Sequence, residues 1–142
     1  MKFVEKKFFK ICSLVSFIYF LLFFSLIAGQ VNLSAHGGYT FETFSNQKSI
    51  AVFLSIFNTS YEDKVITSVS SSISKKAEFH SHSNENNIIK MKKVDKILVK
   101  AKDSFFFQPG KYHIMIFSLK KELKDGDEFD VKLFLDDGSS IN

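Results

Sequence analysis

Cysteine is nearly absent from this 142-residue sequence: the only one, Cys12, lies in an apolar stretch close to the N-terminus. The rest of the chain therefore lacks the thiols that disulfides, Cys-x-x-Cys redox motifs and cysteine metal sites require. No Ser/His/Asp or Cys/His arrangement typical of nucleophilic catalysis can be traced. The paired acidic residues near the C-terminus are typical of turns and surfaces, so the sequence predicts a protein that is not an enzyme.

Arginine is missing altogether, and all 19 basic residues are lysines. Such a bias is typical of genome composition, and it weakens any argument built on runs of lysine. The formal net charge is +4, but residues 1–30 hold four lysines against one glutamate. The remaining chain holds fifteen lysines against fourteen acidic residues and is nearly neutral. The charge therefore predicts no nucleic-acid partner.

The first 30 residues combine a lysine-rich start with an apolar run over residues 11–28. A basic segment followed by an apolar one is the pattern of an export signal. The run is longer than most signal cores and slightly shorter than a spanning helix. We expect residues 1–30 to be a cleaved signal peptide or an uncleaved membrane anchor. Both alternatives place the domain that follows, residues 36–142, outside the cytoplasm, in the periplasm.

The chain beyond residue 36 alternates apolar and polar residues with a period of two, and no stretch sustains a helical period. Regularly spaced short strands predict an all-β domain, either a β-sandwich or a Greek-key barrel. The segment 118–127 is expected to hold a helical turn at most. The strands are predicted over residues 37–44, 49–58, 64–71, 75–82, 88–94, 96–101, 104–108, 111–119 and 128–136.

Two methionines and two histidines form an ordered series: His80, ten residues, Met91, twenty-one residues, His113, one residue, Met115. The spacing of His113 and Met115 places both on one face of a strand. Thioethers are soft ligands that suit Cu(I), and two imidazoles with two thioethers form a tetrahedral set that this ion accepts. Taken singly, each of these residues also has a simpler interpretation, a solvated histidine or a methionine that fills a gap in the packing.

The same series resembles the motif of the periplasmic copper chaperones called PCuAC or DUF461 proteins. The flanking segments are also similar, from "AVFLSIFNTSYEDKVITSVSSSISKKAEFH" to "FQPGKYHIMIFSLKKELKDGD", so that the resemblance covers about residues 50–136. It implies a cupredoxin-like fold and one Cu(I) ion bound by His80, Met91, His113 and Met115. It also implies copper supply to the CuA subunit of cytochrome oxidase, alone or with a Sco-type thiol protein.

The chain departs from the family pattern after the first histidine, where Ser81 and His82 replace the usual acidic residue. His82 could be an additional ligand that supports a weaker Cu(II) mode, or a merely exposed residue. His36 has no counterpart in the motif. The Asn-x-Ser/Thr triplets at Asn32 and Asn58 are common by chance and indicate nothing.

The sequence is also compatible with two other functions. The domain could sequester copper for tolerance, without a delivery partner. It could also be a secreted adhesion module whose methionines and histidines are incidental.

Overall fold

The computed structural model describes residues 32–85 and 88–142, and the predicted export segment, residues 1–30, lies outside them. The described residues form ten strands. These are β1 (Leu33–Tyr39), β2 (Ser49–Asn58), β3 (Lys64–Ser71), β4 (Lys76–Glu85), β5 (Ile88–Val94), β6 (Ile97–Val99), β7 (Ser104–Phe107), β8 (Tyr112–Phe117), β9 (Val131–Leu135) and β10 (Ser140–Ile141). These described ranges contain no helix that is long and apolar enough to cross a membrane.

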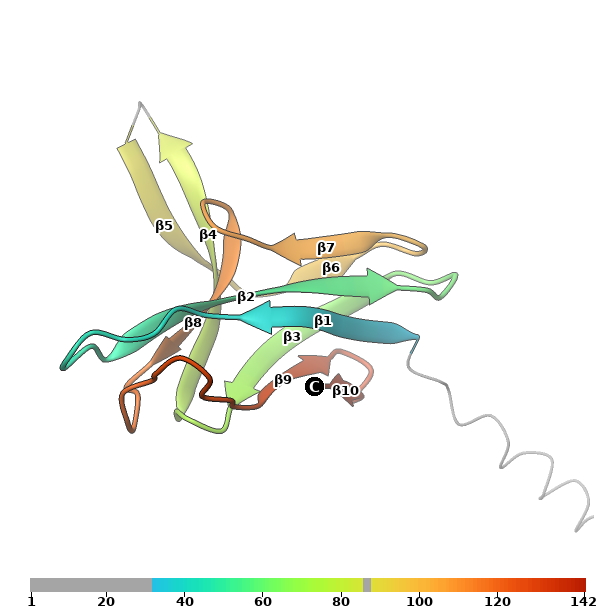
Figure 1. The fold of residues 1–142 in the computed structure, drawn as a ribbon. Coiled ribbons are helices and arrows are strands. Elements are labelled where there is room, and N and C mark those ends of the chain that lie inside the picture. Colours follow the sequence, from blue (N-terminus) through green and yellow to red (C-terminus); the bar gives the residue numbers. More distant parts are fainter. Residues whose placement is uncertain (1–31, 86–87) are drawn as a thin grey trace, which may run out of the picture. The chain divides into compact units, whose positions relative to one another are not determined.

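The strands form two antiparallel sheets (Figure 1). One sheet has the order β1-β2-β8-β4-β5, with β7 also paired to β2, and the other has the order β10-β9-β3-β6. Strand β2 is long enough to pair with β8 along its first half and with β7 along its second half. The prediction of an all-β sandwich is therefore confirmed.

The core lies between the two sheets and consists mainly of aliphatic side chains from alternate strand positions. In β2 these are Ile50, Val52, Leu54 and Ile56. Complete burial of such a side chain contributes about 1.5–3 kcal/mol. The intervening positions of β2, which include Ala51 and Phe53, belong to the opposite face of the sheet. That opposite face carries the candidate site.

The first predicted strand, residues 37–44, is displaced in the structure. The strand β1 ends at Tyr39, and its register against β2 shifts between His36 and Tyr39. Gly37 has φ +65° there, a left-handed conformation that most residues avoid and that accompanies β-bulges. The next segment leaves the sheet, and Thr43 exchanges hydrogen bonds with the backbone of Leu123 instead.

A hairpin and a turn place the strands of the candidate site. Strands β4 and β5 form a hairpin that extends away from the other strands, drawn in yellow in Figure 1. Strand β8 follows the turn at Pro109-Gly110, where Lys111 N–H donates to Gln108 O at 3.1 Å. Gly110 has φ +78°, as the third position of a type II turn requires.

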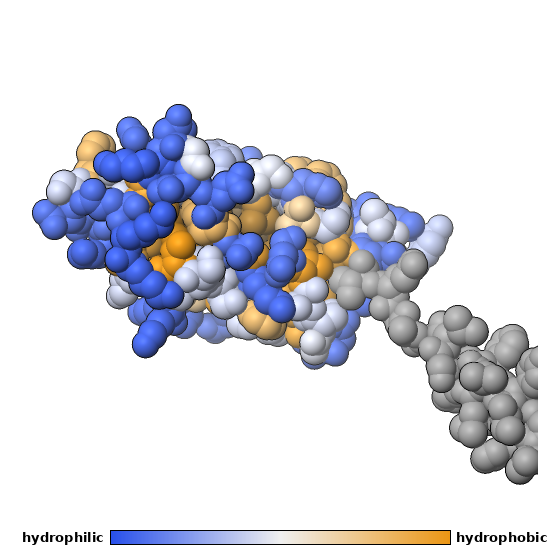
Figure 2. All heavy atoms as spheres, turned by 60° about the horizontal axis from the view of Figure 1, so that its bottom comes forward, coloured by the Kyte–Doolittle hydropathy of each residue, from blue (hydrophilic) through white to orange (hydrophobic). Residues whose placement is uncertain are grey.

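The surface view in Figure 2 shows mainly hydrophilic residues with smaller hydrophobic patches.

Asn58 at the end of β2 is a structural residue that the sequence did not reveal. It is 2% exposed, and its Nδ2 donates to three backbone carbonyls, those of Glu62, Val99 and Lys100, at 2.8–3.1 Å. Its Oδ1 accepts hydrogen bonds from the backbone and hydroxyl groups of Ser60. The side chain thus joins three separate segments of backbone.

Replacing Asn58 with leucine should destabilise the domain by about 2–4 kcal/mol, because buried polar groups would lose their partners. Denaturant titration measures the change in the free energy of unfolding. Asn32→Ala is the matched control, since Asn32 is exposed and its backbone carbonyl accepts the bonds from Thr59. Equal stabilities of the two variants would contradict this role of Asn58.

Candidate metal centre

The strand register brings the predicted ligands onto one face of the larger sheet. His80 on β4 lies directly opposite His113 on β8, and Glu78 lies opposite Met115. On the other side of β4, His82 lies opposite Met91 on β5. Residues directly opposite each other share a face, as do alternate residues of one strand. The four predicted ligands and His82 therefore all lie on this face, which we call the histidine face.

The histidine face points away from the core, because the intervening residues Phe79, Ile114 and Ile116 belong to the core cluster. His113 is nonetheless only 2% exposed. Its ring lies 6.0 Å from that of His80 and 6.5 Å from that of Phe53, measured between centroids. Neighbouring rings thus bury His113, which is the innermost residue of the candidate site.

Hydrogen bonds fix which nitrogen each of the two imidazoles can offer to a metal ion. His80 Nε2 donates to Glu78 Oε2 at 3.1 Å, and His113 Nδ1 donates to the backbone carbonyl of Lys111 at 3.1 Å. Both partners only accept, so the other nitrogen of each ring carries a free lone pair when the imidazole is neutral. These atoms, His80 Nδ1 and His113 Nε2, are buried and have no hydrogen-bond partner among the described residues.

The protonation states suit metal binding. Burial lowers the pKa of His113, the hydrogen bond to Lys111 opposes this in part, and the nearby His82 and His80 lower it further. His113 is therefore neutral at pH 7, as a ligating imidazole must be. The hydrogen bond from His80, followed by that from Lys93, holds the pKa of Glu78 below its usual value although burial opposes it. Glu78 is therefore an ionised acceptor.

His82 contributes a third imidazole to the histidine face. Its ring centroid lies 4.8 Å from that of His113, and its Nδ1 is likewise buried without a partner in the described ranges. The same ranges contain no group of three His, Cys, Asp or Glu side chains placed closely enough to hold a metal ion. Met91 and Met115 share the histidine face with these imidazoles, and Met91 is 50% exposed.

The sequence model of the LpqE-like lipoprotein family matches residues 31–142. The chain belongs to the LpqE-like family. The protein RP573 of Rickettsia prowazekii (strain Madrid E) is 32% identical over 90 residues, which cover 63% of this chain and 50% of the relative. This LpqE-like chain thus spans about half the length of the curated relative it matches.

Solved structures of PCuAC domains share the fold. The copper-bound PCuAC domain from PmoF2 has a TM-score of 0.63 at 12% identity and covers 77% of this chain and 86% of that domain. DR1885 from Deinococcus radiodurans, solved in its apo form, has a TM-score of 0.60 at 18% identity and covers 80% and 76%. The predicted cupredoxin-like fold and the resemblance to PCuAC proteins are confirmed.

His36 does not join the histidine cluster of this LpqE-like domain. It belongs to β1, where its ring lies 5.7 Å from that of Phe57 and its Nε2 lies 3.1 Å from Ser34 Oγ. His36 lies opposite Ser55 in the sheet. The structure therefore gives His36 a surface position on the edge strand of the sheet.

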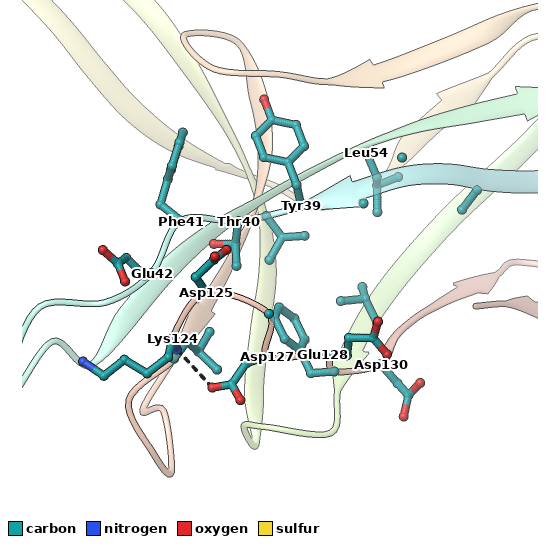
Figure 3. Close-up of a pocket in the computed structure, with 18 of the residues that line it drawn as sticks. Tyr39, Thr40, Phe41, Glu42, Leu54, Lys124, Asp125, Asp127, Glu128 and Asp130 are labelled. Carbon is teal, nitrogen blue, oxygen red and sulfur yellow. Dashed lines mark hydrogen bonds between the residues drawn. The ribbon is translucent and has the colours of Figure 1, made fainter.

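A separate open hollow of about 1150 Å³ lies beside β1 (Figure 3). Residues 35–42 and 123–131 line much of it, and its rim is acidic, whereas none of the four predicted ligands lines it. Asp127 accepts hydrogen bonds from the backbone of Lys124 and from Lys121 Nζ, which lower its pKa. This carboxylate therefore stabilises the turn at residues 124–127. Carboxylates are harder donors than the imidazoles and thioethers of the histidine face.

Proposed function

We propose that this LpqE-like domain is an extracytoplasmic copper chaperone that binds one Cu(I) ion through His80, Met91, His113 and Met115. The observation that carries the proposal is the register of β5, β4 and β8, which gathers two histidines and two methionines on one face. His80 Nδ1 and His113 Nε2, which have no hydrogen-bond partner among the described residues, support it. Solved relatives described as copper-bound and as Cu(I)-DR1885 support the choice of metal.

The chemistry of the ligands favours Cu(I) over other ions. Two neutral thioethers and two neutral imidazoles suit a soft cation and offer little to Mg²⁺ or Ca²⁺. Methionine also keeps its ligating form outside the cytoplasm, where thiols are oxidised to disulfides. Because Met91 is half exposed, thiolates of a partner can displace the ligands one at a time. Transfer by such ligand exchange needs no redox cycle and no catalysis by this chain.

The acceptor we propose is the CuA subunit of cytochrome oxidase, reached directly or through a Sco-type thiol protein. Residues 1–30 would export the domain to the periplasm or hold it at the membrane. If delivery is the role, a deletion strain should lose oxidase activity at low copper and recover it when copper is added. Loss of copper tolerance with normal oxidase activity would favour sequestration instead.

The binding step is tested by loading the protein, recovered from the extracytoplasmic fraction, with Cu(I) under reducing conditions. We expect one copper ion per chain that resists a competing Cu(I) chelator, and no displacement by Mg²⁺ or Ca²⁺. Failure to retain Cu(I) would reject the chaperone proposal. An adhesion module with incidental methionines would give that negative result.

A further inference from the structure

We propose that Glu78 is a positioning residue that fixes the tautomer and the ring orientation of His80. This inference rests on the proposed function, since it concerns how the copper site is prepared. Glu78 and His80 are alternate residues of β4 and share the histidine face. The carboxylate would hold the imidazole so that Nδ1, rather than Nε2, is presented to the ion.

The hydrogen bond between the two side chains supplies the geometry. Glu78 Oε2 lies 3.1 Å from His80 Nε2. An ionised carboxylate can only accept, so Nε2 keeps the proton and Nδ1 keeps the lone pair. His80 Nδ1 is buried and lacks a partner among the described residues. A polar atom that is desolvated without a bond is costly, and coordination of a metal ion would remove that cost.

Glu78 is itself held in place by cations from two strands. Its Oε1 lies 3.3 Å from Lys93 Nζ on β5 and 3.7 Å from Lys76 Nζ on β4. One carboxylate oxygen therefore serves the lysines while the other serves His80. The side chain of Glu78 is only 19% exposed, in contrast with 57% for Lys93. Each ion pair adds little stability at such a surface, but together they restrict where Oε2 can point.

Glu78 is suited to positioning rather than to ligation. A carboxylate is a hard donor that Cu(I) binds poorly, and both oxygens of Glu78 are already engaged. His113 achieves the same result differently, because a backbone carbonyl holds its Nδ1 proton. Ligating histidines commonly have such outer partners, and loss of one typically costs 10–100-fold in metal affinity. These two hydrogen bonds therefore leave Nδ1 free in His80 and Nε2 free in His113.

The test compares three variants of Glu78 in the full chain. Glu78→Leu removes the acceptor, Glu78→Gln keeps an acceptor oxygen without the charge, and Glu78→Asp keeps the charge but withdraws the oxygen. Long-range ¹H–¹⁵N NMR of the metal-free protein reports the His80 tautomer. Competition with a chelator reports Cu(I) affinity. Glu62→Leu is the matched control, because Glu62 is an exposed acid paired with Lys64 at 3.6 Å outside the histidine face.

We expect the wild type to show only the Nε2-protonated form of His80, and Glu78→Leu and Glu78→Asp to show a mixture of both forms. The same two variants should bind Cu(I) about 10–100-fold more weakly, whereas Glu78→Gln should stay within about tenfold and Glu62→Leu should match the wild type. If Glu78→Leu does not fold, the contrast between Glu78→Asp and Glu78→Gln decides.

An unchanged His80 tautomer in the Glu78→Leu or Glu78→Asp protein would overturn the inference. So would an equal loss of Cu(I) affinity in Glu78→Gln and Glu78→Leu, because charge rather than the hydrogen bond would then be responsible. A tautomer change together with a wild type that retains no Cu(I) would support the positioning of His80 and reject the proposed function. The NMR readout in the absence of metal thus separates the two failures.

Discussion

Replacing Met115 with leucine should weaken Cu(I) binding by more than about 100-fold, since loss of an outer partner of a ligand alone costs 10–100-fold. Met115 lies on β8 between Ala51 of β2 and Glu78 of β4, and it is partly buried. Leucine preserves the hydrophobic volume but has no sulfur. Folding should therefore change by less than about 1.5 kcal/mol, so that the loss of affinity reflects the missing ligand.

Competition with a Cu(I) chelator measures the affinity, and denaturant titration measures the stability of the same samples. Ile116→Leu is the control, because Ile116 is the next residue of β8 and belongs to the core on the opposite face. It should keep its affinity for Cu(I). A Met115→Leu protein with wild-type affinity would refute the four-ligand site, and Met91→Leu would then show whether either thioether is needed.

Much of the candidate site could be predicted because the spacing of the histidines and methionines along the sequence indicates which of their side chains share a strand face. Because residues 111–119 are predicted to form a strand, the interval of two residues places His113 and Met115 on one face. The polar segment before Ile88 likewise predicts a hairpin that returns β5 to β4. The sequence could not give the register, and a shift of one residue would have turned Met91 to the opposite face.

What the sequence did not show depends on contacts between distant segments. His113 is buried because Phe53 and two further imidazoles pack around it. Glu78 reads as an ordinary charged residue of an alternating strand, and only its position beside His80 and Lys93 reveals its partners. The interval of two residues between Glu78 and His80 is the local feature of the sequence that places both side chains on one face of the strand. The alternation predicts a strand that continues to residue 44, whereas β1 ends at Tyr39 after a shift of register against β2.

Replacing His82 with alanine should separate the two oxidation states of copper. Cu(II) prefers imidazole and oxygen donors to thioethers. Beside His113, His82 supplies a third buried nitrogen that lacks a partner in the described part of the chain. The His82→Ala protein should keep its Cu(I) affinity within a few-fold. Its weaker Cu(II) affinity should fall by more than about tenfold, a change of about 1.4 kcal/mol. Chelator competition under reducing and oxidising conditions measures the two affinities on one preparation.

The matched control for His82 is His36→Ala, which removes an exposed imidazole from β1 whose contacts are with Ser34 and Phe57. It should alter neither affinity. If Cu(I) binding collapsed in His82→Ala while Cu(II) binding survived, His82 would be a primary ligand in place of His80. The register makes that outcome a real alternative, because His82 and not His80 lies directly opposite Met91. Intact Cu(I) binding would instead mean that Met91 reaches across the diagonal of the hairpin toward His80.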